Sequence, residues 1–352
     1  MSKNRQITIV DIADAAGVSI ATVSNVLNRR KVPMSEGTIR KVEKIAEELG
    51  YRRNVMAANL SRRKSFELGL MIPNYDAYYG RFAEEMERTA HRFGYHMSVF
   101  SAGGFDPDME KRHLEVLLQR RVDGLFCHGL AMTPDTTRQI VGDGTPLVLF
   151  NAWNWPQDIA IHAVNLNFAD GCVQAVHHLV EQGCEALVYL SSVRSKATNE
   201  QRLKGFLQGL TELNTQSVAS GIVDLKDRPM SELVKQTQEI SGGKGPIGIL
   251  AFDDLAALRF MSAVQEQGYR VPEQYKIFGI NNDPVSSACY PPISTLDIPY
   301  SQQAQYAITL MLRQLGEEPD TDEGVPALPD SIEHELRIPM AMLPRLSTSS
   351  KS

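Results

Sequence analysis

The chain has 352 residues, 43% of them hydrophobic and 22% charged, an ordinary globular composition with room for two or three domains. No run approaches the roughly 20 apolar residues that span a bilayer, and no signal-peptide pattern follows Met1. We therefore expect a cytoplasmic protein with no membrane partner. Scattered cysteines without CxxC spacing argue against a disulfide framework or zinc site, so no metal and no cofactor is expected; they are Cys127, Cys172, Cys184 and Cys289.

The net charge of −6 is unevenly distributed along the chain. Residues 1–64 carry 13 Lys and Arg against 6 Asp and Glu, whereas residues 65–352 carry 23 against 36. A short basic segment ahead of an acidic body is typical of a polyanion-binding head. A solvated basic tail would carry the same charge. The helical pattern inside the segment has to distinguish such a tail from a folded polyanion-binding head.

The first 52 residues carry three helical patterns. Thr8 is expected to cap the first helix, and Gly17 supplies the tight turn that ends it. Ser19 is expected to cap a second helix, and a third begins near Ser35 and stops at Gly50. Two short helices joined by a glycine turn and supported by a third predict a helix-turn-helix. The residues expected to face its core are Ile9, Ile12, Ala13, Ala16, Val23, Val26, Leu27, Ile39, Val42, Ile45 and Leu49.

The outer face of the second helix favours DNA as the partner. It carries small and hydroxyl residues, which let a backbone approach phosphates, and asparagines, whose amides reach base edges. A three-helix bundle that binds protein is the alternative, but such a surface would more typically expose large apolar anchors.

The run from Ala16 to Asn28, AGVSIATVSNVLN, resembles the head of the lactose-repressor (LacI/GalR) family, whose pattern is AGVSxxTVSxVLN. The resemblance implies an operator of double-stranded DNA, with Ile20, Ala21 and Asn25 at the base-reading positions. Only Asn25 has a side-chain amide that can donate and accept hydrogen bonds at the same base, an arrangement that suits adenine. The positions that match family contacts to the sugar-phosphate backbone are Thr8, Ser19, Thr22, Ser24, Asn28, Thr38, Tyr51 and Asn54.

Residues 53–64 resemble the hinge helix of the same family. In that family a leucine, paired across a dimer, wedges into a minor-groove step, and Leu60 matches that position. Ala57 lies in the same matching segment and is counted with the DNA contacts. An ordinary contact of Leu60 with the core is the alternative. Arg53 stands where the family usually has proline, so we expect a less rigid start to the hinge.

From residue 65 onward, apolar runs alternate with amphipathic segments, which predicts doubly wound parallel α/β sheets. Two such halves place a ligand crevice at the carboxyl ends of their strands. The expected strands are Phe66–Ile72, Tyr95–Ser101, Val122–Cys127, Leu147–Asn151, Leu187–Ser191, Ile247–Phe252 and Lys276–Asn281. The expected helices are Tyr79–Phe93, Pro107–Arg120, Phe168–Gln182, Glu200–Leu213, Ser231–Ile240 and Asp254–Gln267.

The resemblance continues through this body and implies a two-lobed, periplasmic-binding-protein-like (type I) core over residues 65–345. Crossovers are expected near Val164, Tyr290 and Leu328. The N-lobe would then span about 65–163 plus 291–327, and the C-lobe about 164–290 plus 328–345. No heptad-repeat tail follows Met340, so a homodimer is expected.

A small-molecule effector is implied between the lobes. The matching positions are Arg81, Phe82, Asn151, Lys196, Thr198, Arg202 and Asn281. Trp153 is added to them from its own sequence context, because it stands with Trp155 in the polar loop that follows Asn151. Many relatives carry aspartates where this chain has Asn151 and Asn281. We therefore expect a cationic crevice that favours a sugar acid or sugar phosphate over a neutral sugar. For Trp153, stacking on the effector and packing at the lobe hinge are equally open.

Nothing in the sequence supports an enzyme. The adjacent carboxylates of Asp253 and Asp254 stand where a helix begins and are expected to cap it. The glycines around Lys244 lack the phosphate-loop pattern, and neither HExxH nor GxSxG occurs. The expected function is a homodimeric, operator-binding regulator, most simply a repressor, that responds to a small metabolite. A sugar-binding or enzymatic α/β protein with a non-functional head is the alternative.

Overall fold

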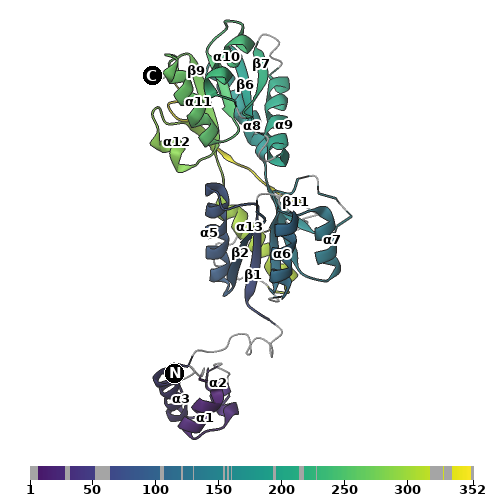
Figure 1. Ribbon diagram of the computed structural model, residues 1–352, viewed down its shortest axis with the longest axis vertical. Helices are drawn as coiled ribbons and strands as arrows, with labels where there is room; N and C mark the ends of the chain where they lie inside the picture. Colours follow the sequence, from purple (N-terminus) through teal and green to yellow (C-terminus); the bar gives the residue numbers. More distant parts are fainter. Residues whose placement is uncertain are drawn as a thin grey trace. The chain divides into compact units, whose positions relative to one another are not determined.

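The chain divides into two compact units in the computed structural model, residues 1–65 and residues 66–352 (Figure 1). The structure describes residues 7–27, 32–51, 64–103, 107–119, 122–129, 131–153, 155–156, 158–159, 161–192, 196–213, 218–226, 228–317, 328 and 335–349. The two units are described separately below.

The head unit contains the predicted helices α1 (Ile9–Ala16), α2 (Ile20–Leu27) and α3 (Glu36–Glu48). The axes of α1 and α2 differ in direction by 110°, within the range of a helix-turn-helix. Their shared core consists of Ile12, Ala13, Ala16, Val23, Val26, Val42 and Ala46. Leu49 was expected in this core, but 38% of its surface is exposed, so that prediction is wrong.

Local side-chain contacts explain where these helices begin and end. The backbone N–H of Thr8 donates to the Asp11 carboxylate at 2.8 Å, and the Ser19 hydroxyl accepts from the backbone N–H of Thr22 at 3.1 Å. Gly17 has a φ of 63°, in the left-handed region that ends α1 and turns the chain into α2. The predicted capping residues and glycine turn are therefore confirmed.

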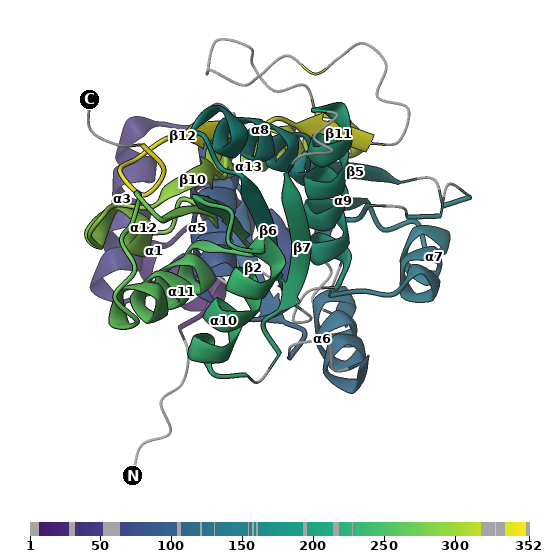
Figure 2. The same ribbon diagram turned by 90° about the horizontal axis from the view of Figure 1, so that it is seen from above.

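The second unit contains two six-stranded sheets, one in each lobe (Figures 1 and 2). The N-lobe sheet has the order β11-β5-β4-β3-β1-β2, and all its strands are parallel. The C-lobe sheet has the order β12-β10-β9-β8-β6-β7, and only β12 runs antiparallel to its neighbour. The strands are β1 (Glu67–Ile72), β2 (His96–Ser101), β3 (Gly124–His128), β4 (Leu147–Phe150), β5 (His162–Leu166), β6 (Ala186–Ser191), β7 (Ala219–Asp224), β8 (Ile247–Ala251), β9 (Tyr275–Asn281), β10 (Ser294–Asp297), β11 (Glu335–Ile338) and β12 (Ala341–Leu343).

Helices cover the sheets of both lobes, as expected for doubly wound folds. The N-lobe helices are α5 (Ala77–Arg92), α6 (Pro107–Gln119), α7 (Pro134–Gly142) and α13 (Tyr300–Gln314), and the C-lobe helices are α8 (Phe168–Glu181), α9 (Lys196–Glu212), α10 (Met230–Ser241), α11 (Asp254–Glu266) and α12 (Pro284–Ala288). One buried cluster runs from the N-lobe through Leu166 and Ile298 into the C-lobe. The lobes therefore share part of their apolar core.

The first crossover lies close to Val164, as the resemblance implied, but the other two lie later in the chain than expected. β5 ends in the N-lobe at Leu166, and β10 still pairs within the C-lobe sheet as far as Asp297. β11 returns to the N-lobe sheet and ends at Ile338. The predicted crossovers near Tyr290 and Leu328 are therefore placed too early, by about seven and ten residues respectively. By strand pairing and helix packing, the described residues within 66–166 and 300–338 belong to the N-lobe, and those within 168–297 and 341–349 belong to the C-lobe.

Candidate DNA-binding surface and effector crevice

The first turn of α2 presents an exposed surface on the head. Ser19, Ile20 and Ala21 are exposed, and Ile20 keeps 47% of its surface accessible although it is apolar. Asn25 lies one turn further along α2 and is half-buried. Of the expected phosphate contacts, Thr8 is exposed, and the half-buried ones are Thr22, Ser24, Thr38 and Tyr51. An exposed isoleucine at a helix start offers apolar contact to a thymine methyl once DNA covers it.

Four further DNA contacts expected from the sequence, among them the hinge leucine, lie outside the described residues; they are Asn28, Asn54, Ala57 and Leu60. Their roles stay predictions from the sequence.

Three of the expected effector residues lie at or beside the carboxyl ends of strands. Asn151 follows β4 and Asn281 ends β9, while Arg202 reaches the same place from α9. Both asparagines have a positive φ, 50° and 116°. Non-glycine residues adopt such angles rarely, and they cluster at functional sites.

Arg202 is the most buried cation of this crevice, with 3% of its surface exposed. Its guanidinium lies between the rings of Phe168 and Phe252, 4.3 and 4.4 Å from their centroids. It donates to the carbonyl oxygen of Phe252 and, at 3.2 Å, to the side-chain oxygen of Asn281. Its Nε is buried and has no hydrogen-bond partner among the described residues. Arg202 is therefore held rigidly with one donor unused.

The side chain of Asn151 is occupied by structural contacts. Its amide nitrogen donates to the hydroxyl of Tyr78 at 2.6 Å. Its oxygen accepts from the backbone N–H of Leu166 and from Gln303, both at 3.2 Å. Asn151 therefore ties β5 and α13 together, and an effector would reach it mainly through Tyr78.

Trp153 lies at the first crossover. Its indole N–H donates to the carbonyl oxygen of Leu166 at 3.1 Å, and its ring packs against Phe168 at 5.6 Å between centroids. Only 8% of its surface is exposed. Of the two roles left open by the sequence, these contacts favour packing at the lobe hinge.

The remaining expected residues differ in their surroundings. Phe82 is fully buried in the N-lobe core, and its ring lies 4.4 Å from that of Phe150 at the end of β4, so its contact with an effector stays a prediction. Arg81, its neighbour on α5, points instead toward the C-lobe. Thr198 is buried near the start of α9, whereas Lys196 is exposed at its first residue.

The sequence analysis missed an aromatic group contributed by α5 and α13. The rings of Tyr78 and Tyr79 meet edge to face at 4.8 Å, and Tyr300 lies 5.5 Å from Tyr78. The guanidinium of Arg81 sits 4.5 Å above the Tyr300 ring. Two adjacent tyrosines after the first strand were a usable signal, but Tyr300 comes from a distant part of the chain.

Carboxylates offset the positive charge expected in the crevice. Partial burial raises the pKa of both Asp76 and Asp283, and the nearby charge of Asp253 raises each further. Asp253 is the predicted N-cap of α11, accepting from the backbone N–H of Ala256 at 2.7 Å. The crevice therefore combines carboxylates, guanidinium groups and tyrosines.

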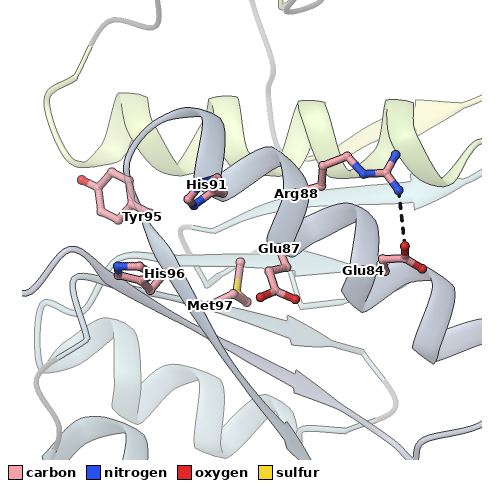
Figure 3. A pocket seen from close by; sticks show the side chains of 7 residues that line it. All are labelled: Glu84, Glu87, Arg88, His91, Tyr95, His96 and Met97. Atoms are coloured by element: carbon pink, nitrogen blue, oxygen red, sulfur yellow. Dashed lines mark hydrogen bonds and ion pairs between the residues drawn. The ribbon is translucent and has the colours of Figure 1, made fainter.

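A separate hollow of about 380 Å³ lies beside the second half of α5 and the start of β2 (Figure 3). Its charges are mixed, and the Arg88 guanidinium pairs with Glu84 at 3.5 Å. It lies toward the amino ends of the strands, away from the crevice. Its lining side chains are Glu84, Glu87, Arg88, His91, Tyr95, His96 and Met97.

The described part of the chain contains no group of three or more His, Cys, Asp or Glu side chains placed to hold a metal ion. No single helix in it is long and apolar enough to cross a membrane; α1 and α2 meet that test of length and composition only as a bent pair.

Comparison with known proteins identifies both units. The family model described as "Bacterial regulatory proteins, lacI family" matches residues 8–54, and the one described as "Periplasmic binding protein-like domain" matches residues 176–337. Catabolite control protein A of Staphylococcus xylosus is 29% identical over 333 residues, which cover 93% of this chain and 98% of that protein.

Two solved structures share the fold. The Lac repressor dimer bound to operator and the anti-inducer ONPF is 22% identical with a TM-score of 0.80, over 98% of this chain and all of that one. The complex of the transcriptional regulator CelR with cellobiose is 19% identical with a TM-score of 0.65, over 97% of this chain and all of that one. With its lacI-family head and the periplasmic-binding-protein-like core behind it, the chain belongs to the LacI/GalR family of transcription regulators.

Proposed function

We propose that the protein is a homodimeric repressor that binds operator DNA through α2 and releases or tightens this grip when a small metabolite enters the crevice. The observation that carries the proposal is Arg202. It is buried between two aromatic rings at the strand ends, yet its Nε lacks a partner among the described residues. A buried polar group left unsatisfied is costly, and such groups concentrate where a ligand completes them.

We propose a sugar or a sugar derivative as the metabolite. Hydroxyl groups both donate and accept, which suits the carboxylate of Asp283, the hydroxyl of Tyr78 and the guanidinium of Arg202. Sugar acids and sugar phosphates remain in the proposal because Arg202 and Arg81 could hold an anion. The carboxylates of Asp76, Asp253 and Asp283 oppose a strongly anionic ligand, so a neutral sugar is now an equal candidate. The name of one relative agrees with this class, since that structure of a transcriptional regulator holds cellobiose.

DNA binding would be coupled to the crevice through lobe closure. A ligand shifts a conformational equilibrium only by its difference in affinity for the two states. Closure would change the spacing of the two hinge segments in the dimer and so the fit of both heads to the operator. Induction and co-repression both follow from this arrangement.

The test is operator binding with and without candidate metabolites. Fluorescence anisotropy on promoter fragments from the chain's own genomic neighbourhood should show sequence-selective binding that some metabolite changes. A thermal-shift screen of neutral sugars, sugar acids and sugar phosphates identifies that metabolite, since saturating ligand should stabilise the core by roughly 2–4 kcal/mol. Absence of selective binding to any local promoter would refute the proposal. The control protein lacks residues 1–64. The metabolite should still raise its melting temperature, but it should no longer bind DNA.

A further inference from the structure

Arg81 contacts the opposite lobe. From α5 of the N-lobe, its Nη1 donates to the backbone carbonyl oxygen of Asn282 at 3.1 Å and lies 3.8 Å from Asp283 Oδ1. Asn282 and Asp283 form the turn between β9 and α12 of the C-lobe. The same guanidinium rests on the Tyr300 ring of the N-lobe. One side chain therefore joins both lobes at the crevice.

The turn that receives Arg81 is fixed firmly within the C-lobe. The backbone N–H of Asp283 donates to the buried carboxylate of Asp254 at 2.7 Å. The side chain of Asn282 accepts from Arg345 at 2.6 Å and donates to Asp297 at 2.8 Å. Because the turn moves with the C-lobe and α5 moves with the N-lobe, the Arg81 contact must form or break as the lobes move.

The groups around Arg81 are incompletely satisfied. Asp283 Oδ1 and the Tyr300 hydroxyl are both buried, and neither has a hydrogen-bond partner within the described residues. The distance of 3.8 Å from Arg81 to Asp283 Oδ1 allows attraction but exceeds a hydrogen bond. A hydroxyl or amine of a ligand could therefore take the place of Arg81 and donate a hydrogen bond to Asp283 Oδ1, which Arg81 does not do.

We propose that Arg81 is a latch between the lobes, which holds the crevice closed on the Asn282–Asp283 turn until an effector donor group replaces it there. The proposal rests on the proposed function in placing the effector in this crevice. It adds a requirement: the effector must present a hydroxyl or amine to Asp283 and Tyr300. Arg81 thereby sets both the resting closure of the lobes and the groups that a ligand needs to open them.

The chain carries its own probe of lobe closure. It has only two tryptophans, Trp153 and Trp155, and Trp153 contacts Leu166 and Phe168 at the first crossover. A change in lobe angle alters these contacts, so the intrinsic fluorescence reports closure without any added label. Small-angle scattering of the core fragment, residues 66–352, gives a second measure because that unit is compact by itself.

The experiment compares Arg81→Met, Asp283→Asn and the double variant without DNA and without metabolite. Methionine keeps an apolar stem on Tyr300 while it removes the charge. The control is Arg88→Met on the same helix, because Arg88 pairs only with Glu84 and Glu85 among the ion pairs of the described residues. All variants are first matched to the parent by circular dichroism, and Arg81→Leu, which also lacks the charge and the donors, replaces Arg81→Met if the latter fails to fold.

Arg81→Met and Asp283→Asn should each change the tryptophan emission and raise the radius of gyration. In the double variant, both quantities should change by no more than they do in the single variant with the larger effect. Arg88→Met should match the parent. The proposal is overturned if Arg81→Met behaves like Arg88→Met, or if the two latch changes simply add. A shift in closure without any metabolite effect on operator binding would leave the latch standing and refute the proposed function instead.

Discussion

Arg202 donates a hydrogen bond to Asn281 across 3.2 Å, and through it the helix α9 is joined to the end of β9. Both side chains are buried, so neither can exchange this bond for one with water. The same guanidinium also donates to the carbonyl oxygen of Phe252 at the end of β8. A single side chain therefore sets the spacing of three elements at the effector crevice.

Replacing Arg202 by Met should lower the free energy of unfolding by about 1–3 kcal/mol, because two buried acceptors lose their donor. Urea unfolding followed by circular dichroism measures the change. The control is Arg259→Met, since Arg259 is exposed on α11 and should change the same quantity by no more than about 0.5 kcal/mol. Equal losses in both variants would show that Arg202 is not a structural anchor of the crevice.

The buried carboxyl of Asp254 makes stability depend on pH. Burial raises its pKa from the ordinary 3.8 to about 7, although it accepts from Thr295 and from the backbone N–H of Asp283. Between these two values the folded state keeps a proton that the unfolded state has released. The contribution of this group to stability is therefore complete below about pH 4 and falls as pH rises toward 7, by at most about 1.4 kcal/mol per unit.

Asp254→Asn should remove this dependence. Asparagine keeps an acceptor for Asp283 and carries no charge, so the variant should gain stability relative to the parent as pH rises from 5 to 8. The buried imidazole of His128, whose pKa burial lowers to about 3, contributes the opposite slope to both proteins and cancels in the difference. A difference in unfolding free energy that is constant over pH would show that Asp254 stays ionised in the fold.

Long elements with one clear periodicity were predictable from the sequence. The strand Ile247–Ala251 and the helix Phe168–Glu181 lie within one residue of their predicted bounds. Five short or edge strands and three helices had no predicted counterpart; they are β5, β7, β10, β11, β12, α7, α12 and α13. α13 is buried along much of its length, which blurs the amphipathic pattern. The crossovers depend on which sheet a four-residue strand such as β10 joins, and no local pattern records that choice.

Part of the effector crevice was predictable as well, because it is built at the ends of predicted strands. Asn151 and Asn281 follow predicted strands, and such positions converge in an open α/β sheet. Tyr300 was missed because it reaches Arg81 from a distant part of the chain, on a helix that was not predicted. Asp283 was missed because its position beside Arg81 depends on the packing of two lobes.

Close packing of α8 and α9 gives a prediction about the C-lobe. A Cβ added at Gly205 of α9 would overlap the carbonyl oxygen of Ala169 of α8, a backbone atom with little freedom to move. Gly205→Ala should therefore destabilise the core by about 1–3 kcal/mol. The control is Gly80→Ala in α5, where nothing lies within 4 Å and alanine should stabilise by about 0.5–1 kcal/mol. Equal melting temperatures for the two variants would contradict the tight contact.

The hinge leucine gives a prediction that rests on the sequence. Leu60→Ala should weaken binding to the specific operator much more than binding to random DNA, because wedging requires a central base step that kinks easily. Anisotropy titrations of both DNAs at one salt concentration measure the ratio. Equal losses on the two DNAs would mean that Leu60 does not insert and contacts the core instead.

Asn25 should carry most of the polar base recognition of the head. It is the only member of the base-reading set with a side chain that both donates and accepts, whereas Ile20 and Ala21 offer apolar contact alone. Asn25→Ala should cost about 1–3 kcal/mol of specific binding and relax selectivity at one base pair, and binding to random DNA should not change. Titration against operators substituted at each position identifies that base pair. If Asn25→Ala weakens all DNAs equally and leaves every base preference intact, Asn25 contacts phosphate, and selectivity arises from apolar contacts and from bending of the operator.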